Sequence, residues 1–213
     1  MRKLLIALVV LVVVFVGADF GLRVWAQSWV AGQLRESLGL SRSPSVSLGG
    51  ILFVPEVVSG HIPSASVHAG GFTSDGVHFE QATLDLRDIR FSASQLFLSH
   101  HEGSIRARTG DGSVAMTGAD MTAALHDQGL PVTVQLAGGE IRLSGGSVPG
   151  EVTVQPSIEG GLLVLRSGGV SVSLNLPEVV PGLDYREVRI EGNAGQLLFT
   201  VSNVVFVVPR SSS

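Results

Sequence analysis

The sequence predicts an α+β fold dominated by β-structure. From Ser45 onward, apolar and polar residues alternate with the period of two that marks strands with one buried face. Six Gly-Gly pairs and the dipeptides Asp75-Gly76 and Asp111-Gly112 punctuate this pattern, as hairpin turns do. Helical patterning is strongest in the first forty residues, before the alternation begins. The length of 213 residues suits a single domain.

An apolar run at the N-terminus predicts export. The 13 residues Leu4–Val16 follow Arg2-Lys3 and match the core of a signal peptide. A small residue, Ala18, stands where signal peptidase would cut. The positive flank keeps the N-terminus inside. We therefore expect the rest of the chain outside the cytoplasm, in the cell envelope or periplasmic space.

The same run is also long enough to begin a membrane anchor. Its apolar majority continues to Ala26 and is interrupted only by Asp19 and Arg23. At about 1.5 Å per residue, this helix would cross the hydrocarbon core with some tilt. Residues 1–18 are therefore either a cleaved signal peptide or the start of a retained anchor.

Residues 19–40 are patterned as an amphipathic helix that continues into the body. Steps of 100° per residue give two apolar stripes on nearly opposite sides. We expect the first stripe to pack on the body: Phe20, Val24, Ala31, Leu34 and Leu38. The second contains Leu22, Trp25 and Trp29, and we expect its tryptophans to touch lipid headgroups, where aromatic side chains collect. The alternative is that both stripes are buried in the domain.

Residues 41–209 are predicted to form the β-rich body, with a polar tail at 210–213. The alternation is clearest in Val132–Leu136, Val170–Leu176 and Ala82–Leu86. After Leu86 it slips phase at Arg87-Asp88, as a β-bulge would cause. Shorter strands are expected at eight further places and a long one at the end: Ser64–Ala69, Gly76–Phe79, Ser104–Ala107, Ser113–Met116, Glu140–Leu143, Glu151–Gln155, Leu162–Leu165, Tyr185–Ile190 and Gln196–Val208.

One helix is predicted among these strands. Thr117–Asp120 resembles a capping box, in which the first and fourth residues satisfy each other's backbone donors. Met121, Ala124 and Leu125 give the helix one apolar face. Gly129-Leu130-Pro131 ends it.

The segment Gly50–Gly60 departs from the alternation because it is almost wholly apolar. Pro55 argues against a central strand there. We expect a turn that leads into a short apolar helix or lip. As an exposed feature, the lip would gate a cavity or dip into a bilayer; the alternative is a plug that fills the core.

Composition and motifs exclude several functions. The net charge is −4, and no basic run follows Arg2-Lys3, so nucleic acid is not an expected partner. The absence of cysteine excludes disulfides and thiolate metal sites. No nucleophile-elbow, phosphate-loop, dinucleotide-binding or zinc-protease pattern is present. His100-His101-Glu102 is a poor metal site because adjacent side chains in a strand point to opposite faces.

The order of these features resembles the LmeA-like family of phospholipid-binding cell-envelope proteins. The glycine-bounded apolar motif of that family stands here as Gly50–Gly60, with Phe53 and paired aliphatic residues in agreement. Leu84–Ile89 is also similar, as is the stretch from Pro177 to Leu183 before the final hairpin. The resemblance runs from the N-terminal helix to the last strand.

The resemblance implies a tubular lipid-binding architecture, in which a twisted antiparallel sheet curls around a long N-terminal helix. It implies binding of anionic phospholipids and a role in the maintenance of envelope lipoglycans of the lipomannan type. It contributes no catalytic residue, and no cofactor or metal is expected. We therefore expect no enzymatic activity.

Candidate site residues follow from the strand pattern and the lip. An apolar groove for acyl chains would be lined by Ile51, Leu52, Phe53, Val57, Val58, Leu84, Leu86, Val172 and Leu174. Residues that could meet headgroups or the membrane interface are Trp25, Trp29, Arg87 and Arg90. Two alternatives stay open: a membrane-tethered structural or assembly module with a solid β core, and, more weakly, an envelope hydrolase.

Overall fold

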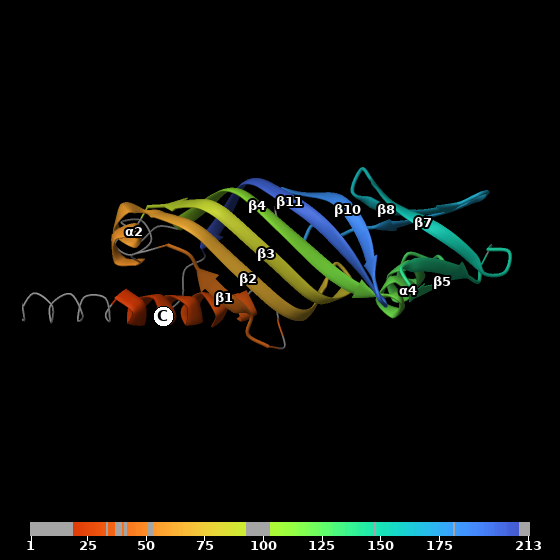
Figure 1. Ribbon diagram of the computed structural model, residues 1–213, viewed down its shortest axis with the longest axis horizontal. Helices are drawn as coiled ribbons and strands as arrows, with labels where there is room; N and C mark the ends of the chain where they lie inside the picture. Colours follow the sequence, from red (N-terminus) through yellow and green to blue (C-terminus); the bar gives the residue numbers. More distant parts are fainter. Residues whose placement is uncertain are drawn as a thin grey trace, which may run out of the picture.

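The protein is described here by a computed structural model that covers residues 19–32, 34–36, 40, 42–50, 53–92, 103–146, 148–180 and 182–208. The predicted fold class is confirmed, because strands dominate and form two antiparallel sheets that are not closed, accompanied by a few helices. The molecule is elongated (Figure 1). Helix α2 (Phe53–Ser59) lies at one end, and helix α4 (Gly118–Asp127) lies towards the other.

The larger sheet has six strands in the order β1-β2-β3-β4-β11-β10, and every neighbouring pair is antiparallel. Its four central strands are 14 or 15 residues long, more than twice the usual strand. This length lets the sheet twist and curve from the α2 end of the molecule towards α4 (Figure 1). The strands are β1 (Ser45–Leu48), β2 (His61–Ser74), β3 (Val77–Phe91), β4 (Gly103–Thr117), β10 (Leu183–Glu191) and β11 (Ala194–Val208).

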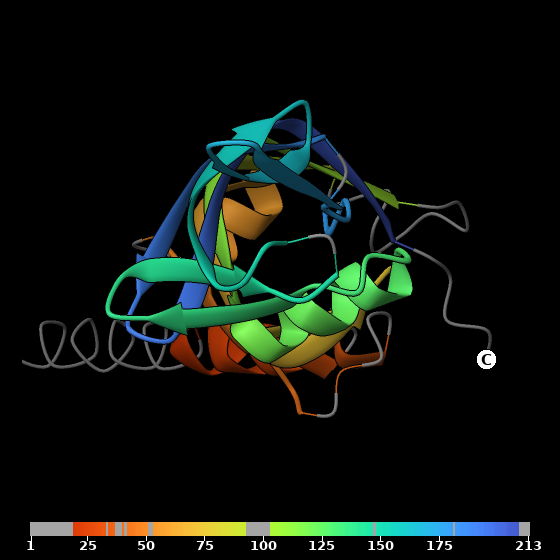
Figure 2. The same cartoon turned by 90° about the vertical axis from the view of Figure 1, so that its right-hand side faces the viewer.

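The smaller sheet has five strands that follow one another in space as in sequence. Predicted Gly-Gly turns at 138–139, 160–161 and 168–169 make three of the four connections, and positive φ angles at five of these six glycines explain the choice of residue. Figure 2 shows this sheet and the larger one around a common centre. The strands are β5 (Thr133–Ala137), β6 (Glu140–Ser144), β7 (Val152–Glu159), β8 (Leu162–Ser167) and β9 (Val170–Asn175).

The helix predicted after Thr117 is confirmed as α4, and so is its capping box. The Asp120 amide donates to Thr117 Oγ1 at 3.1 Å, and the Thr117 amide donates to the Asp120 carboxylate at 2.8 Å. The expected apolar face is buried. Thr122 also joins the helix to β5, because its hydroxyl accepts the Val134 amide at 2.8 Å.

Two predicted turns are wrong. Gly70-Gly71 lies inside β2, and Asp111-Gly112 lies inside β4. The β4 glycines serve packing instead. A Cβ at Gly112 would overlap the Phe199 ring, and one at Gly110 would stand 2.8 Å from the side chains of both Leu86 and Val201. These glycines therefore leave space for large side chains of the neighbouring strands.

The predicted phase slip on β3 is confirmed, but its form differs from a β-bulge. Register continues without a shift between β2 and β3 and between β3 and β4. Instead, β2, β3, β4 and β11 all turn two consecutive residues outward at the same level. We call this line the crease. It comprises residues 63–64, 87–88, 108–109 and 202–203, and Asp88 and Asn203 adopt left-handed φ angles there.

The core is one contiguous cluster to which both sheets, α2 and α4 contribute. It includes large side chains with no exposed surface, such as Phe79, Met121, Leu143 and Leu197. Helix α2 lies across one end of the curved sheet, since Figure 1 shows it at that end and Figure 2 shows it within the outline of the strands. Its Phe53 belongs to the cluster.

Candidate functional site

Most of the predicted lipid-binding residues share the interior. Phe53 on α2, Leu86 on β3 and Val172 and Leu174 on β9 are buried members of the core cluster. Val57 on α2 and Leu84 on β3 are half-buried and pack against the same cluster. The sequence pattern thus selected inward-facing residues from three separate parts of the chain.

The other predicted lip residues are not placed with them. The Val58 side chain is 75% exposed and points away from the interior. Ile51 and Leu52 lie outside the described residues. Of the three predicted residues on helix α2, Phe53 is therefore buried in the core, Val57 is half-buried and Val58 is directed outward.

The N-terminal helix (residues 19–32 and 34–36) presents its largest apolar side chains outward, whereas Leu34 is half-buried. Of the seven large hydrophobic side chains exposed in the described part of the chain, five lie on this helix: Phe20, Leu22, Val24, Trp25 and Trp29. The packing prediction is wrong for Phe20 and Val24, although Ala31 is buried as expected and Ala26 touches the core cluster. Leu38 lies outside the described residues.

The side of this helix that faces the body is polar at its start. Among the described residues, Asp19 is the only charged side chain that is buried. Its carboxylate accepts the Phe53 amide at 2.9 Å and the Val54 amide at 2.7 Å, so it caps the first turn of α2 from another helix. One turn later, Arg23 donates to the Gly50 carbonyl at 2.9 Å and lies 5.9 Å from the centre of the Phe53 ring. We call Asp19 and Arg23 the clamp.

A basic cluster lies on the outer face of the sheet, next to α2. His61, Arg90 and Arg106 are directly opposite one another on β2, β3 and β4, and all three are exposed. Asp88, in the crease, is 3.2 Å from His61, 3.0 Å from Arg90 and 2.9 Å from Arg108. Hydrogen bonding from Arg90, followed by the positive charges of Arg90, Arg108 and His61, lowers the pKa of Asp88. We call these four basic residues the basic cluster.

The predicted headgroup residues have different surroundings. Arg90 belongs to the basic cluster and is hydrogen-bonded to Asp88. Arg87 lies in the crease beside Asp88, but it pairs with Asp111 at 3.5 Å, with both side chains exposed. Trp25 and Trp29 are 64% and 53% exposed on the N-terminal helix.

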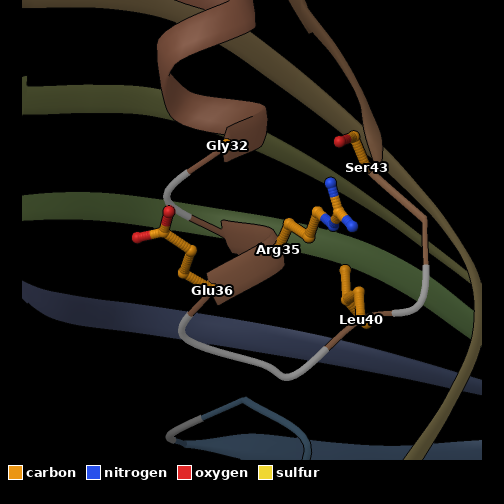
Figure 3. Close-up of a pocket in the computed structure, with 5 residues that line it drawn as sticks. All are labelled: Gly32, Arg35, Glu36, Leu40 and Ser43. Atoms are coloured by element: carbon orange, nitrogen blue, oxygen red, sulfur yellow. The ribbon is translucent and has the colours of Figure 1, made fainter.

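Among the cavities along the described residues are two that no predicted lipid-binding residue lines. A space of about 520 Å³ lies between the end of the N-terminal helix and the stretch before β1 (Figure 3), where Arg35 points towards Ser43 and Glu36 points away. Its lining is Gly32, Arg35, Glu36, Leu40 and Ser43. The second, of about 280 Å³, is lined by Asp75, Val77, Gln128, Asn175, Leu176 and Pro177. Their mixed polar linings do not suit an acyl chain.

Neither a metal site nor a membrane-spanning helix occurs within the described ranges. No three His, Asp or Glu side chains of this part of the chain converge as metal ligands do. His100-His101-Glu102 lies outside it. The described helices are too short or too polar to cross a bilayer.

The clamp was missed by sequence reasoning, which treated Asp19 and Arg23 as interruptions of an apolar segment. A signal was present, because the two charges are four residues apart and therefore share one face of a helix. Charged side chains in an apolar segment need partners. Their partners, three backbone groups some thirty residues away, have no signature in the sequence.

The comparison with protein families gave one match. A model of the LmeA-like phospholipid-binding family matches residues 17–210, nearly the whole chain. The matched range includes the N-terminal helix, α2, both sheets and the basic cluster. Neither a curated protein nor a solved structure matches the chain.

Proposed function

The chain belongs to the LmeA-like phospholipid-binding family, and from that premise we propose that it is an exported, membrane-associated protein that holds phospholipid acyl chains in its apolar interior. The observation that carries this proposal is the single apolar cluster to which α2 and both sheets contribute. The two sheets are not closed, so acyl chains can enter between them without disrupting a closed ring of paired strands. The family is a lipid-binding family and not a known enzyme family, and we propose no catalytic activity.

Reversible loading is consistent with an interior that offers no fixed polar site. Removing some 30 methylenes from water yields about 24 kcal/mol, at roughly 0.8 kcal/mol each. A lipid that arrives from a bilayer gives up about the same amount when it leaves. The net free energy of transfer is therefore small, and binding depends on how well the interior accommodates the chains.

The proposed ligand is an anionic phospholipid. The basic cluster lies beside α2, and its three arginines and one histidine include only three residues that contact the single carboxylate of Asp88: His61, Arg90 and Arg108. This excess of positive charge would attract a phosphate headgroup at the α2 end while the acyl chains occupy the interior. In the envelope, such a protein would support lipid or lipoglycan maintenance of the lipomannan type.

The test is native mass spectrometry of the full chain, extracted gently from membranes. We expect co-purified phospholipid, and we expect less of it in Leu174→Asp and Phe53→Asp. Val57→Asp alters a half-buried residue. It provides a second measurement of co-purified phospholipid if a core variant does not fold. Ser173→Asp is the matched control, since Ser173 neighbours Leu174 on β9 and faces outward. A lipid-free spectrum, even after incubation with phospholipid vesicles, would contradict the proposal.

The second candidate, a membrane-tethered structural module with a solid β core, is favoured by one observation. Phe199 fills the space above Gly112, and many interior side chains have no exposed surface. A filled interior would leave no room for acyl chains unless it opens. The lipid-free outcome of the same experiment would favour this candidate.

A further inference from the structure

Residues 19–29, the first eleven described residues of the N-terminal helix, are arranged in reverse of an ordinary surface helix. Its charged residues, Asp19 and Arg23, face the body, whereas its largest apolar residues face away from it. A helix on a water-soluble domain buries its apolar side instead. The exposed polar group of Ser28 is satisfied within the helix, because its hydroxyl donates to the Val24 carbonyl at 3.0 Å, as hydroxyls in membrane helices do.

We propose that the N-terminal segment is retained as a membrane anchor, that residues 20–29 lie against lipid, and that the clamp locks this anchor to α2. The α2 end of the body is then held at the bilayer surface. This rests on the membrane association proposed above and adds the fate of the segment, the surface that meets the bilayer and the contact that orients the body.

The occupant of the exposed apolar face is a phospholipid bilayer because of what precedes it in the chain. The apolar run Leu4–Val16 ends three residues before Asp19, so a segment of membrane-spanning character leads directly into the reversed helix. Cleavage at Ala18 would leave Phe20, Trp25 and Trp29 facing water without a partner. Retention covers them with lipid.

Two further surfaces at the same end suit a bilayer. The clamp holds the start of α2 against the anchor. Val58 nevertheless projects from α2 and is 75% exposed. His61, two residues beyond the end of α2, begins the row of basic residues that continues through Arg90 and Arg106. An apolar projection beside a basic row matches the acyl and headgroup layers of an anionic membrane.

The clamp couples the anchor to α2 through backbone groups. Asp19 satisfies two amides at the start of α2, and Arg23 binds the carbonyl of Gly50, three residues before it. These contacts fix the beginning of α2 to the anchor without depending on any side chain of α2. The position of α2 over the end of the sheet therefore follows the position of the anchor.

The chain supplies its own probe for the first test. Its two tryptophans, Trp25 and Trp29, are both on the reversed helix, so tryptophan fluorescence reports this surface alone. For the full chain in vesicles of phosphatidylcholine and phosphatidylglycerol, we expect severalfold quenching by brominated phospholipid and little quenching by aqueous acrylamide. The intact mass of the exported protein should include residues 1–18. Quenching by acrylamide but not by brominated lipid, or an N-terminus at Asp19, would overturn the proposal.

The second test addresses the clamp. Because the chain has no cysteine, Val58→Cys provides a unique site for an environment-sensitive label. We expect brominated lipid to quench this label, and expect Asp19→Ala to reduce that quenching severalfold while tryptophan quenching stays unchanged. The control label is at Thr153→Cys, an exposed position on β7. A label at 58 that brominated lipid quenches no more than the label at 153 would contradict the orientation.

The failure of this inference is distinguishable from failure of the proposed function. Brominated-lipid quenching of the tryptophans without co-purified phospholipid would refute interior lipid binding and leave the anchor intact. Co-purified phospholipid in a chain that begins at Asp19 would refute the anchor and leave lipid binding intact.

Discussion

The ring of Phe199 lies against Gly112 of the neighbouring strand, where the two residues are register partners. A Cβ at residue 112 would overlap the ring and would stand 2.6 Å from the Thr83 carbonyl on the opposite side. The ring can move aside, but the β3 backbone cannot move without breaking its hydrogen bonds to the neighbouring strands. The packing of the larger sheet at this point therefore requires a residue without a side chain.

Gly112→Ala should destabilise the fold. We expect a loss of roughly 1–3 kcal/mol, the usual cost of overpacking a core, measured by denaturant unfolding. Gly70→Ala is the matched control, since Gly70 is also inside a strand but a Cβ there would meet no atom within 4 Å. Phe199→Leu should restore only part of the loss in the double variant, because the clash with Thr83 remains. Equal stability of the two alanine variants would contradict this account.

Thr122→Val should weaken the junction between α4 and β5. The Thr122 hydroxyl donates to the Gly118 carbonyl at 2.7 Å and accepts the Val134 amide at 2.8 Å. Valine keeps the shape but leaves that amide without its acceptor, at a cost of about 1–3 kcal/mol. Hydrogen exchange of the Val134 amide should accelerate accordingly. Thr122→Ser keeps the hydroxyl and should retain most of the protection; equally fast exchange in both variants would argue against the hydrogen bond.

The acid at the centre of the basic cluster should make stability depend on pH. The pKa of Asp88 is lowered in the folded state, first by its hydrogen bond from Arg90. Its stabilisation is therefore present above the ordinary carboxyl range and lost as pH falls through the lowered value. Asp88→Asn should be less stable than the wild type at neutral pH, and the difference should shrink in acid. A difference that is constant across this range would contradict the assignment.

Tyr185 should resist ionisation in the folded protein. Its hydroxyl donates to the Pro177 carbonyl at 2.9 Å, and burial raises the pKa of the phenol. Because this is the only tyrosine, absorbance at alkaline pH reports it alone. We expect phenolate to appear only when the protein unfolds. The raised pKa contributes stability to the fold at every pH below the ordinary pKa of tyrosine, and this stability is lost as the pH rises from there through the raised pKa. A normal titration curve without unfolding would exclude the buried geometry.

The sequence patterns predicted elements whose cause is local. The capping box at Thr117 and the turn at Asp75-Gly76 depend on residues within a few positions, and both are present. The β strands were also found, but as fragments, because Gly-Gly pairs and a phase slip within a strand look like its ends. Only the neighbouring strand shows that Gly70-Gly71 continues β2.

The candidate site was predictable only in part for the same reason. Alternation identified Leu86, Val172 and Leu174 as inward-facing. That these residues meet in one core depends on long-range strand pairing, which alternation does not show. The outward direction of Phe20 and Val24 could not be derived from periodicity, because the helix is apolar on both of its exposed flanks. The body-facing side is selected instead by Asp19 and Arg23, whose partners lie far along the chain.

The crease also restricts how this chain can change over time. Ile62, Ile89, Ala107 and Val204 face inward on one side of it only because each of their strands takes the same extra outward residue. Deleting Asp88 alone would either turn Ile89 towards solvent or shift β3 by one residue against both neighbours. Four separate strands must therefore inherit the irregularity together, and single-residue deletions there should be absent among related chains that keep the fold.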